Sequence, residues 1–221
     1  MNRYAVIVAA GKGERMGSAL PKQFIELKGL PVLMHTLRRF HESVSPEIIL
    51  VLNVHFHAHW ETLCTQHDFK VPHRLVNGGI TRFDSVARGL KLVTKKGIVA
   101  VHDAVRPIVS ERLIINCFEQ AEKLGNAVPA VPCRESLRKG SLDDSRSLSR
   151  DDYYLVQTPQ CFGSSLLKRA YQQPFRNEFT DDASVVERTG TSIHLIHGET
   201  SNIKITYPSD LAIAEVLLST T

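Results

Sequence analysis

The sequence predicts an α/β fold, with a mostly parallel sheet, helices on both of its faces and a β-hairpin that projects from it. Short apolar runs alternate along the chain with segments of helical period, and this alternation is typical of parallel sheets. The runs at residues 4–10, 47–53 and 98–102 are apolar on both faces, as strands between two helical layers are. No internal repeat or linker interrupts the pattern, so residues 1–221 are expected to form one domain.

The remaining elements follow from periodicity and from turn and cap residues. Further strands are expected at residues 74–76, 127–131, 153–157, 192–196 and 202–206. Helices are expected at residues 32–41, 60–67, 84–93, 111–124, 164–171, 181–189 and 208–218. Ser110 and Thr180 are the candidate N-caps of two of these helices. Pro208 suits the first turn of the last helix.

Residues 133–152 break the α/β pattern. Two weakly alternating polar segments flank a turn-rich stretch at residues 140–145, which predicts a hairpin arm. A polar hairpin has little core of its own. Support by a partner surface and a mobile surface hairpin are therefore both open interpretations of the arm.

Composition excludes several classes of protein. The chain is 43% hydrophobic and 23% charged, which does not fit a disordered, collagen-like or coiled-coil protein. No apolar run approaches the roughly 20 residues that span a bilayer, so no membrane partner is expected. The net charge of +4 suits anionic substrates but is too small to indicate nucleic acid. The four scattered cysteines form no Cys-x-x-Cys pair, which predicts reduced thiols and a cytoplasmic location.

A glycine loop with two cations follows the first strand, where α/β sheets bind ligands. Gly11 and Gly13 allow main-chain amides to approach phosphate oxygens, and Arg15 and Lys22 would neutralise a triphosphate. A P-loop is excluded because no Gly-Lys-Ser/Thr is present, and Met16 breaks the dinucleotide fingerprint. The alternative is a solvated charged turn.

Asp103 closes an apolar strand and is therefore expected at the same edge of the sheet. A single carboxylate that faces a polyphosphate is a natural ligand of Mg²⁺. Arg106 follows three residues later and could bind a second phosphate. The alternative is a turn cap with a local salt bridge.

Three further segments are weaker candidates. Gly79 lies in a glycine pair that would allow contact with a flat base, and Ser85 would add a hydroxyl in the first helical turn, although an ordinary capped helix explains both. Lys204 alternates with apolar neighbours and could point into a cleft or be an edge-strand lysine. The run of His55, His57 and His59 is interpreted as exposed loop or helix-start histidines rather than a metal site.

Six short motifs occur together in one order. They are Ala9-Ala10-Gly11-x-Gly13-x-Arg15-Met16, Pro21-Lys22-Gln23, His102-Asp103-Ala104-x-Arg106-Pro107, Thr158-Pro159-Gln160, Thr180-Asp181-Asp182-Ala183-Ser184 and Asn202-Ile203-Lys204-x-Thr206. From about Tyr4 to Glu215 the ordered set resembles the 2-C-methyl-D-erythritol 4-phosphate cytidylyltransferases of the non-mevalonate isoprenoid pathway. The resemblance implies a Rossmann-like nucleotidyltransferase fold, a homodimer, and transfer of a cytidylyl group from CTP with release of pyrophosphate.

The resemblance also implies a role for each matching residue. It assigns Arg15, Lys22 and Lys204 to catalysis and Asp103 to Mg²⁺. The nucleotide-binding set is Ala9, Ala10, Gly11, Gly13, Gly79, Ile80 and Ser85. The set around methylerythritol phosphate is Arg106, Ser136, Arg150 and Thr180, with Ser136 and Arg150 on the arm at residues 133–152.

Two residues depart from the family pattern, and two other functions stay open. Ser136 replaces the usual threonine but keeps the hydroxyl, and Ile80 stands where an acidic residue can occur. The alternative enzyme is a ribitol 5-phosphate cytidylyltransferase, which shares the loop motifs. The alternative of another class is an inactive nucleotide-binding regulatory protein. Against that alternative, Arg15, Lys22, Asp103 and Lys204 are all present.

Overall fold

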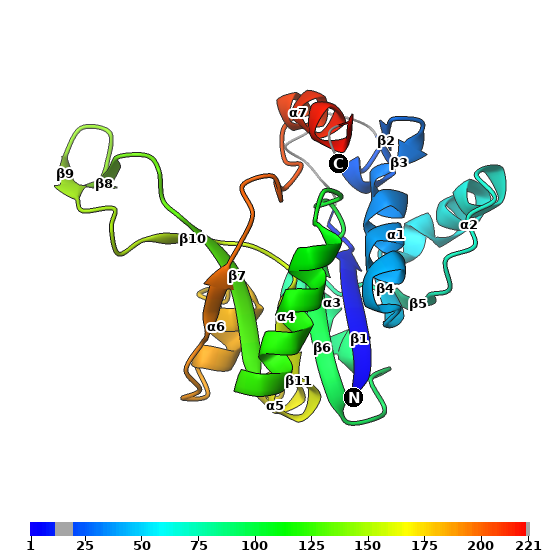
Figure 1. Ribbon diagram of the computed structural model, residues 1–221, viewed down its shortest axis with the longest axis horizontal. Coiled ribbons are helices and arrows are strands. Elements are labelled where there is room, and N and C mark those ends of the chain that lie inside the picture. The colour runs from blue at the N-terminus through cyan, green and yellow to red at the C-terminus, as the bar shows by residue number, and fades with distance from the viewer. Residues whose placement is uncertain (12–19, 220–221) are drawn as a thin grey trace.

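Figure 1 shows the computed structural model, which describes residues 1–11 and 20–219. The strands of its main sheet are β1 (Asn2–Ala9), β4 (Glu47–Leu52), β5 (Arg74–Asn77), β6 (Gly97–Asp103), β7 (Asn126–Pro132), β10 (Tyr154–Val156), β11 (Gln160–Gly163) and β12 (Leu195–His197). Their spatial order is β10-β7-β11-β6-β1-β4-β5, with β12 paired to β7. β1 pairs in parallel with both β4 and β6, and β4 pairs in parallel with β5. The predicted mixed α/β fold with a mostly parallel sheet is confirmed.

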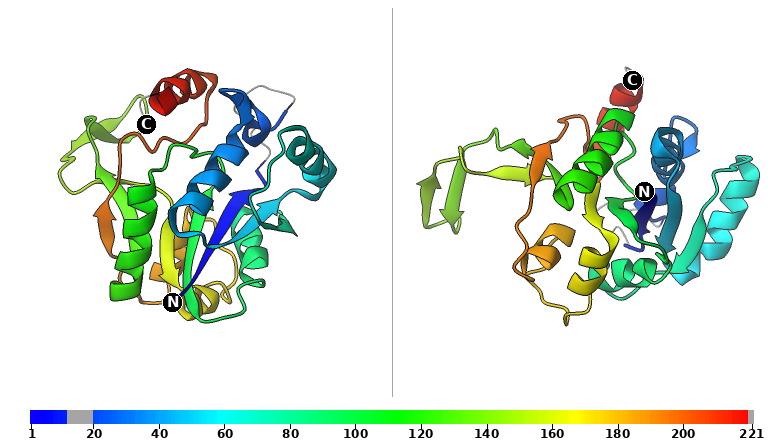
Figure 2. Two further views of the ribbon diagram at one scale, coloured as in Figure 1. Left: turned by 45° about the vertical axis from the view of Figure 1, so that its right-hand side comes forward. Right: turned by 60° about the horizontal axis from the view of Figure 1, so that its bottom comes forward.

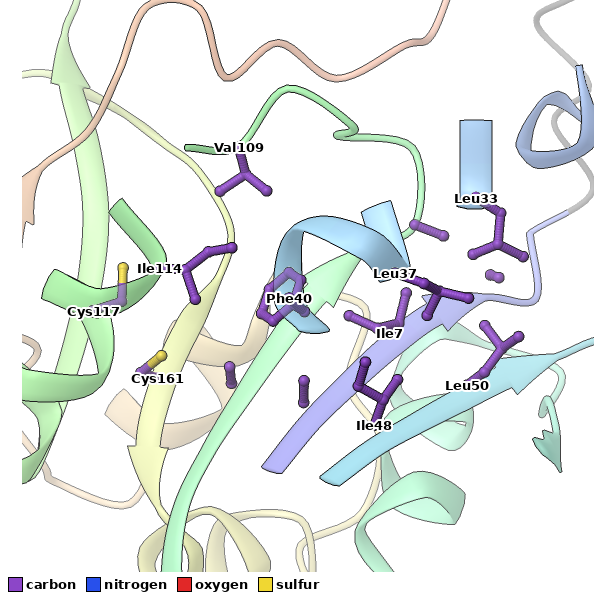
Figure 3. Close-up of a cluster of buried hydrophobic side chains, with 14 of the residues drawn as sticks. Ile7, Leu33, Leu37, Phe40, Ile48, Leu50, Val109, Ile114, Cys117 and Cys161 are labelled. Atoms are coloured by element: carbon purple, nitrogen blue, oxygen red, sulfur yellow. The ribbon is translucent and has the colours of Figure 1, made fainter. Parts of the chain in front are cut away.

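Helices cover both faces of this sheet (Figures 1 and 2). One hydrophobic cluster includes side chains of α1 (Val32–Val44), α2 (His57–Gln66) and α4 (Glu111–Leu124). A second cluster includes side chains of α3 (Arg82–Leu90), α5 (Ser164–Ala170) and α6 (Asp182–Glu187) on the opposite face. Figure 3 shows Leu37 and Phe40 of α1 near Ile7 of β1 and Ile48 of β4. Burial of each such side chain contributes roughly 1.5–3 kcal/mol, so the sheet is stabilised from both sides.

The apolar strands end together at one edge of the sheet, the upper edge in Figure 1. Along this edge lie α7 (Pro208–Ser219) and the short elements η2 (Lys22–Phe24), β2 (Glu26–Leu27), β3 (Leu30–Pro31) and η3 (Val54–Phe56). Ala214 of α7 is buried with Leu27, Val105 and Ile205 in a third hydrophobic cluster. The C-terminal helix is thereby packed against β2 and the segment that follows β6.

Most predicted elements lie where the sequence places them. The helix at residues 111–124 has the predicted bounds, Ser110 is its N-cap, and Gly125 ends it with a φ of 88°. The run of histidines lies in η3 and at the start of α2, where His55 is exposed but His57 and His59 are half-buried. Within the described residues no group of three or more His, Cys, Asp or Glu side chains could hold a metal ion by itself. No helix in the described part of the chain is long and apolar enough to cross a membrane.

Two expectations for individual elements are wrong, and one strand of the sheet was not predicted. Residues 202–206 are not a strand; Ile205 N–H donates to Val105 O at 2.9 Å, but this main-chain bond does not continue as a ladder. The N-cap of α6 is Asp181 rather than Thr180, because the Asp181 carboxylate accepts from Ser184 N–H at 2.9 Å and completes a capping box. The periodicity also gave no indication of β11, which runs antiparallel between β6 and β7.

The polar segment at residues 133–152 contains the predicted hairpin. Its strands β8 (Leu137–Gly140) and β9 (Ser145–Leu148) pair only with each other in the described structure. Figures 1 and 2 show this arm extending from the end of the sheet formed by β7 and β10, away from the helical layers. Leu142 at the tip of the arm is fully exposed. The side chains of β10 are also exposed, each by 41–57% of its surface.

Candidate functional site

A cavity of about 790 Å³ opens where β1 and β6 end and α3 begins. Its lining residues are Val8, Ala9, Ala10, Gly11, Lys22, Gln23, Asn53, Gly79, Ile80, Thr81, Arg82, Ser85, Asp103, Ala104, Val105 and Lys204. The carboxyl ends of parallel strands are where α/β sheets bind ligands. The cavity thus brings together predicted residues from several separate motifs.

Two predicted catalytic lysines converge on the cavity from opposite ends of the chain. Lys22 opens η2 directly after Pro21, and its Nζ donates to Ile205 O at 2.8 Å. Lys204, one residue before Ile205, places its Nζ 3.0 Å from Asp103 Oδ2. Two ammonium groups at one wall favour an anionic ligand, because charge-assisted hydrogen bonds to its oxygens would replace the water that each ammonium loses.

Asp103 lies inside a cluster of three cations. Its Oδ2 is 3.0 Å from Lys204 Nζ and 3.4 Å from Arg106 Nε, and its Oδ1 is 3.6 Å from Arg82 Nε. Burial alone would raise the pKa of Asp103, but the positive charges of Arg82, Lys204 and Arg106 outweigh it and hold that pKa well below the usual range. The carboxylate is therefore ionised throughout the neutral pH range, and the cluster keeps a net positive charge.

Arg82 is a cavity residue that the sequence reasoning missed. Its guanidinium donates to Asp182 Oδ2 at 2.7 Å, and the Asp182 side chain is fully buried on α6. Tyr171 Oη donates to the other oxygen of that carboxylate at 2.6 Å. The only signal in the sequence is a charged residue two positions before a predicted helix, and its partner follows 100 positions later. Pairing over such a separation is not visible in one sequence.

Gln23 is a second missed residue and is only 2% exposed. Its Nε2 donates to Ala9 O at 2.8 Å and to Gly11 O at 3.3 Å. The amide therefore ties the end of β1 to η2, where Lys22 lies. The Pro21-Lys22-Gln23 motif therefore has two functions, because its lysine lines the cavity and its glutamine holds the end of β1.

The paired glycines are required by the protein itself. A Cβ on Gly78 would lie 2.3 Å from Ala10 Cβ, and one on Gly79 would lie 2.2 Å from Asp84 Cβ. Ser85 Oγ accepts from Gly79 N–H at 3.0 Å and donates to Thr81 O at 2.9 Å. The side chain of Ile80 is 99% exposed at the cavity rim. Close packing thus explains why both positions are glycine, and Gly79 and Ser85 line the cavity together with Ala10.

Arg106 and Thr180 lie outside the set of residues that line the cavity. Arg106 contacts Asp103 and donates from Nη1 to Asn202 O at 2.8 Å. Thr180 lies just before α6. Gln160 of β11 holds that helix start, because it donates to Asp181 Oδ2 and accepts from Ala183 N–H, both at 2.8 Å. Arg106 therefore adjoins the cavity through Asp103, whereas the described structure shows no hydrogen bond or ion pair from Thr180 to a residue that lines it.

The structure does not bring the two arm residues to the cavity of the same chain. Ser136 and Arg150 are exposed on the arm, where the Arg150 guanidinium donates to Arg134 O. Figure 1 shows the arm projecting away from the strand ends that form the cavity. Gly13 and Arg15 lie outside the described residues, between Gly11 on the cavity wall and Leu20.

Comparison with known proteins gives a consistent family. The family model described as 2-C-methyl-D-erythritol 4-phosphate cytidylyltransferase matches residues 4–220. A curated protein of that name from Porphyromonas gingivalis is 51% identical, with 98% of each chain covered. One from Bacteroides fragilis is 49% identical, and the match covers 99% of this chain and 100% of that one.

A solved structure agrees with the sequence comparisons. The crystal structure of 2-C-methyl-D-erythritol 4-phosphate cytidylyltransferase from Thermus thermophilus superposes with a TM-score of 0.82 at 32% identity. The match covers 99% of this chain and 100% of that one. The family match across almost all residues, with relatives that share half of the sequence, shows that the chain belongs to the 2-C-methyl-D-erythritol 4-phosphate cytidylyltransferase family.

Proposed function

We propose that this cavity is where the chain transfers the cytidylyl group of CTP to 2-C-methyl-D-erythritol 4-phosphate, with release of pyrophosphate. Family membership supplies the reaction, in isoprenoid precursor synthesis by the non-mevalonate pathway. The observation that supports the assignment of the site is the convergence of Lys22, Lys204 and Asp103 on one cavity at the strand ends. None of the relatives described above is named as a ribitol phosphate enzyme or a regulatory protein, which favours methylerythritol phosphate as the substrate.

The nucleoside is proposed to bind along the floor of the cavity. Ala9, Ala10 and Gly11 follow β1, and Gly79, Ile80 and Ser85 form the facing wall. Ala10 and Gly79 both line the cavity, and Gly79 carries no side chain that would keep a flat base from its main chain. Ile80 has no polar side-chain atom, so only its main chain is proposed to bind the base. Gly13 and Arg15 are proposed to contact the triphosphate.

The chemistry proposed is direct attack by the substrate phosphate on the α-phosphorus of CTP. Phosphoryl and nucleotidyl transfer depend on positioning and on neutralising charge that grows in the transition state. Arg15, Lys22 and Lys204 are proposed for that role. No Ser or Cys with an adjacent base lines the described part of the cavity, which supports a reaction without a covalent enzyme intermediate. Arg106 and Thr180 are proposed to bind the methylerythritol phosphate.

Mg²⁺ is proposed as the cofactor, with Asp103 as its protein ligand. The donor set fits an ion that enters together with the triphosphate, because Mg²⁺ usually takes one or two carboxylates and fills its other positions with phosphate oxygens and water. A free ion would be repelled by the three cations around Asp103. Bound there, Mg²⁺ would withdraw charge from the phosphate oxygens.

Asp103→Asn should raise the Mg²⁺ concentration for half-maximal activity about tenfold or more. The amide keeps the shape but loses the full charge, and at this range such a charge is worth at least about 1.4 kcal/mol, or a factor of ten in binding. Mg²⁺ titration of pyrophosphate release measures the shift. Asp68→Asn is the matched control, because Asp68 is an exposed carboxylate that pairs only with Lys70 in the described structure. An unchanged Mg²⁺ requirement would mean that Asp103 is not the ligand.

The arm at residues 133–152 is proposed to complete the cavity of a second copy in a homodimer. Ser136 and Arg150 lie on the arm, away from their own chain's cavity, which supports binding in the partner. The exposed β10 side chains Tyr154 and Leu155 would be covered by the same association. We further propose that residues 1–221 act as one nucleotidyltransferase domain. All four cysteines are free thiols, which supports a cytoplasmic location.

Pyrophosphate release with CTP tests the proposed function. We expect turnover with 2-C-methyl-D-erythritol 4-phosphate and at least about tenfold lower kcat/KM with ribitol 5-phosphate, because a site built to pair one set of hydroxyls leaves polar groups unpaired with another. UTP in place of CTP is the control for base selection. Equal or better turnover of ribitol 5-phosphate would overturn the substrate assignment, and no release with either polyol would overturn the activity.

A further inference from the structure

His102 is a fully buried residue behind the cavity for which the proposed reaction has no step. It is the next-to-last residue of β6, directly before Asp103, and its side chain is 0% exposed. Phe40 of α1 packs against the imidazole, with ring centroids 4.9 Å apart. The imidazole therefore cannot contact substrate, and any effect it has on the reaction must act through its neighbours.

The hydrogen bonds of His102 fix which nitrogen carries the proton. Asp103 N–H donates to Thr158 Oγ1 at 3.1 Å, and that oxygen lies 3.0 Å from His102 Nδ1. His102 Nε2 lies 3.2 Å from Arg106 O, and a carbonyl oxygen can only accept, so Nε2 carries a proton. A neutral imidazole carries only one such proton, so Nδ1 accepts from the Thr158 hydroxyl.

These bonds hold the turn at residues 103–106 from both ends. One nitrogen of His102 reaches the Asp103 amide through Thr158, and the other holds the Arg106 carbonyl. Asn202 links the same two residues a second time. Its side-chain Nδ2 donates to Thr158 O at 2.8 Å, and its main-chain O accepts from Arg106 Nη1 at 2.8 Å. The two charged side chains of this turn are those assigned to Mg²⁺ and to the polyol phosphate.

We propose that His102 is a positioning residue for cytidylyl transfer, which holds the Asp103 carboxylate and the Arg106 guanidinium in register with their two ligands. The inference rests on the proposed function of the cavity. A histidine suits this position because one rigid ring supplies an acceptor at one end and a donor at the other. A displacement of about 1 Å at a reacting group can cost on the order of a hundredfold in rate, so the turn must be held tightly.

Three substitutions separate the effects of the two hydrogen bonds that His102 makes, one with Thr158 and one with Arg106 O. His102→Phe keeps the ring that packs on Phe40 and removes both polar contacts. His102→Asn places an acceptor near the position of Nδ1 but loses the donor to Arg106 O. His102→Gln reaches the position of Nε2 and can keep that donor but loses the acceptor for Thr158. Phe118→Leu is the control for loss of stability alone, because Phe118 is fully buried on α4 and does not line the cavity.

The experiment measures kcat, KM for each substrate and the Mg²⁺ requirement, beside the unfolding temperature of every variant. We expect His102→Phe to lose at least about tenfold in kcat/KM. His102→Asn should mainly raise KM for 2-C-methyl-D-erythritol 4-phosphate, and His102→Gln should mainly raise the Mg²⁺ requirement. Wild-type kinetics in the folded His102→Phe enzyme would overturn the proposal. So would parallel losses in the Asn and Gln variants that match the Phe118→Leu control. An inactive wild-type enzyme would instead overturn the proposed function.

Discussion

Lys22→Ala should lower kcat by about a hundredfold or more, which corresponds to about 3 kcal/mol of transition-state stabilisation. The Lys22 ammonium lies at the cavity wall, where it donates to Ile205 O, and Lys204 lies beside that carbonyl. Negative charge on the phosphate oxygens grows during transfer, so a cation at a fixed position stabilises the transition state more than bound CTP. Steady-state measurement of pyrophosphate release gives kcat and KM separately.

Two comparisons make the Lys22 result specific. Lys91→Ala is the matched control, because Lys91 is an exposed lysine at the end of α3 and does not line the cavity. The unfolding temperature of Lys22→Ala shows whether loss of the bond to Ile205 O changes the fold. A near wild-type kcat with only a raised KM would mean that Lys22 binds substrate and transition state equally well.

Mixing two inactive variants should restore about a quarter of wild-type activity if the arm acts in the partner. The variants are Lys22→Ala and Arg150→Ala, and each homodimer is expected to be nearly inactive. After random subunit exchange about half of the dimers are mixed. One site of each mixed dimer then carries both lesions and the other carries none. A guanidinium at position 150 suits bidentate binding of the substrate phosphate.

The control for subunit mixing uses two lesions in one cavity. Lys22→Ala mixed with Lys204→Ala should regain nothing, because both lysines line the same cavity of one chain and every site keeps one lesion. Mass spectrometry of differently labelled subunits confirms that exchange has occurred. If exchange is complete and the Arg150→Ala mixture regains nothing, Arg150 does not act across the dimer, although the cytidylyltransferase assignment is unaffected.

The strand ends of this fold were predictable because burial leaves a direct trace in the sequence. Residues 98–102 are mostly apolar and Asp103 stops the run, so both the strand and the placement of its last carboxylate follow from hydropathy alone. Ser110 is followed by a long amphipathic segment, and that helix has the predicted bounds. An apolar or amphipathic run that begins or ends at a charged or capping residue therefore predicts both the buried element and one of its ends.

The remaining features depend on contacts between distant segments. Residues 202–206 alternate like a strand, but they are held by Val105 O and by Asp210, whose carboxylate accepts from Thr206 N–H at 2.7 Å. Arg82 has its partner on α6, and Gln23 bonds to main-chain carbonyls. Neither hydropathy nor residue spacing records such partners. The sequence therefore predicts Lys204 and Asp103 as candidate site residues, but it does not predict the ion pair between them.

The bond from Lys22 to Ile205 O joins residues 183 positions apart. A loop of that length closes late, because its chain entropy must be lost before the contact forms. In a partly folded chain Lys22 and Lys204 would then not yet lie side by side. CTP would therefore bind only molecules in which these two distant segments have come together. By mass action, nucleotide would then oppose global unfolding of the native state, while it would leave the openings of separate surface segments such as the arm unaffected. Occupancy by substrate and integrity of the whole fold are thus thermodynamically linked in this protein.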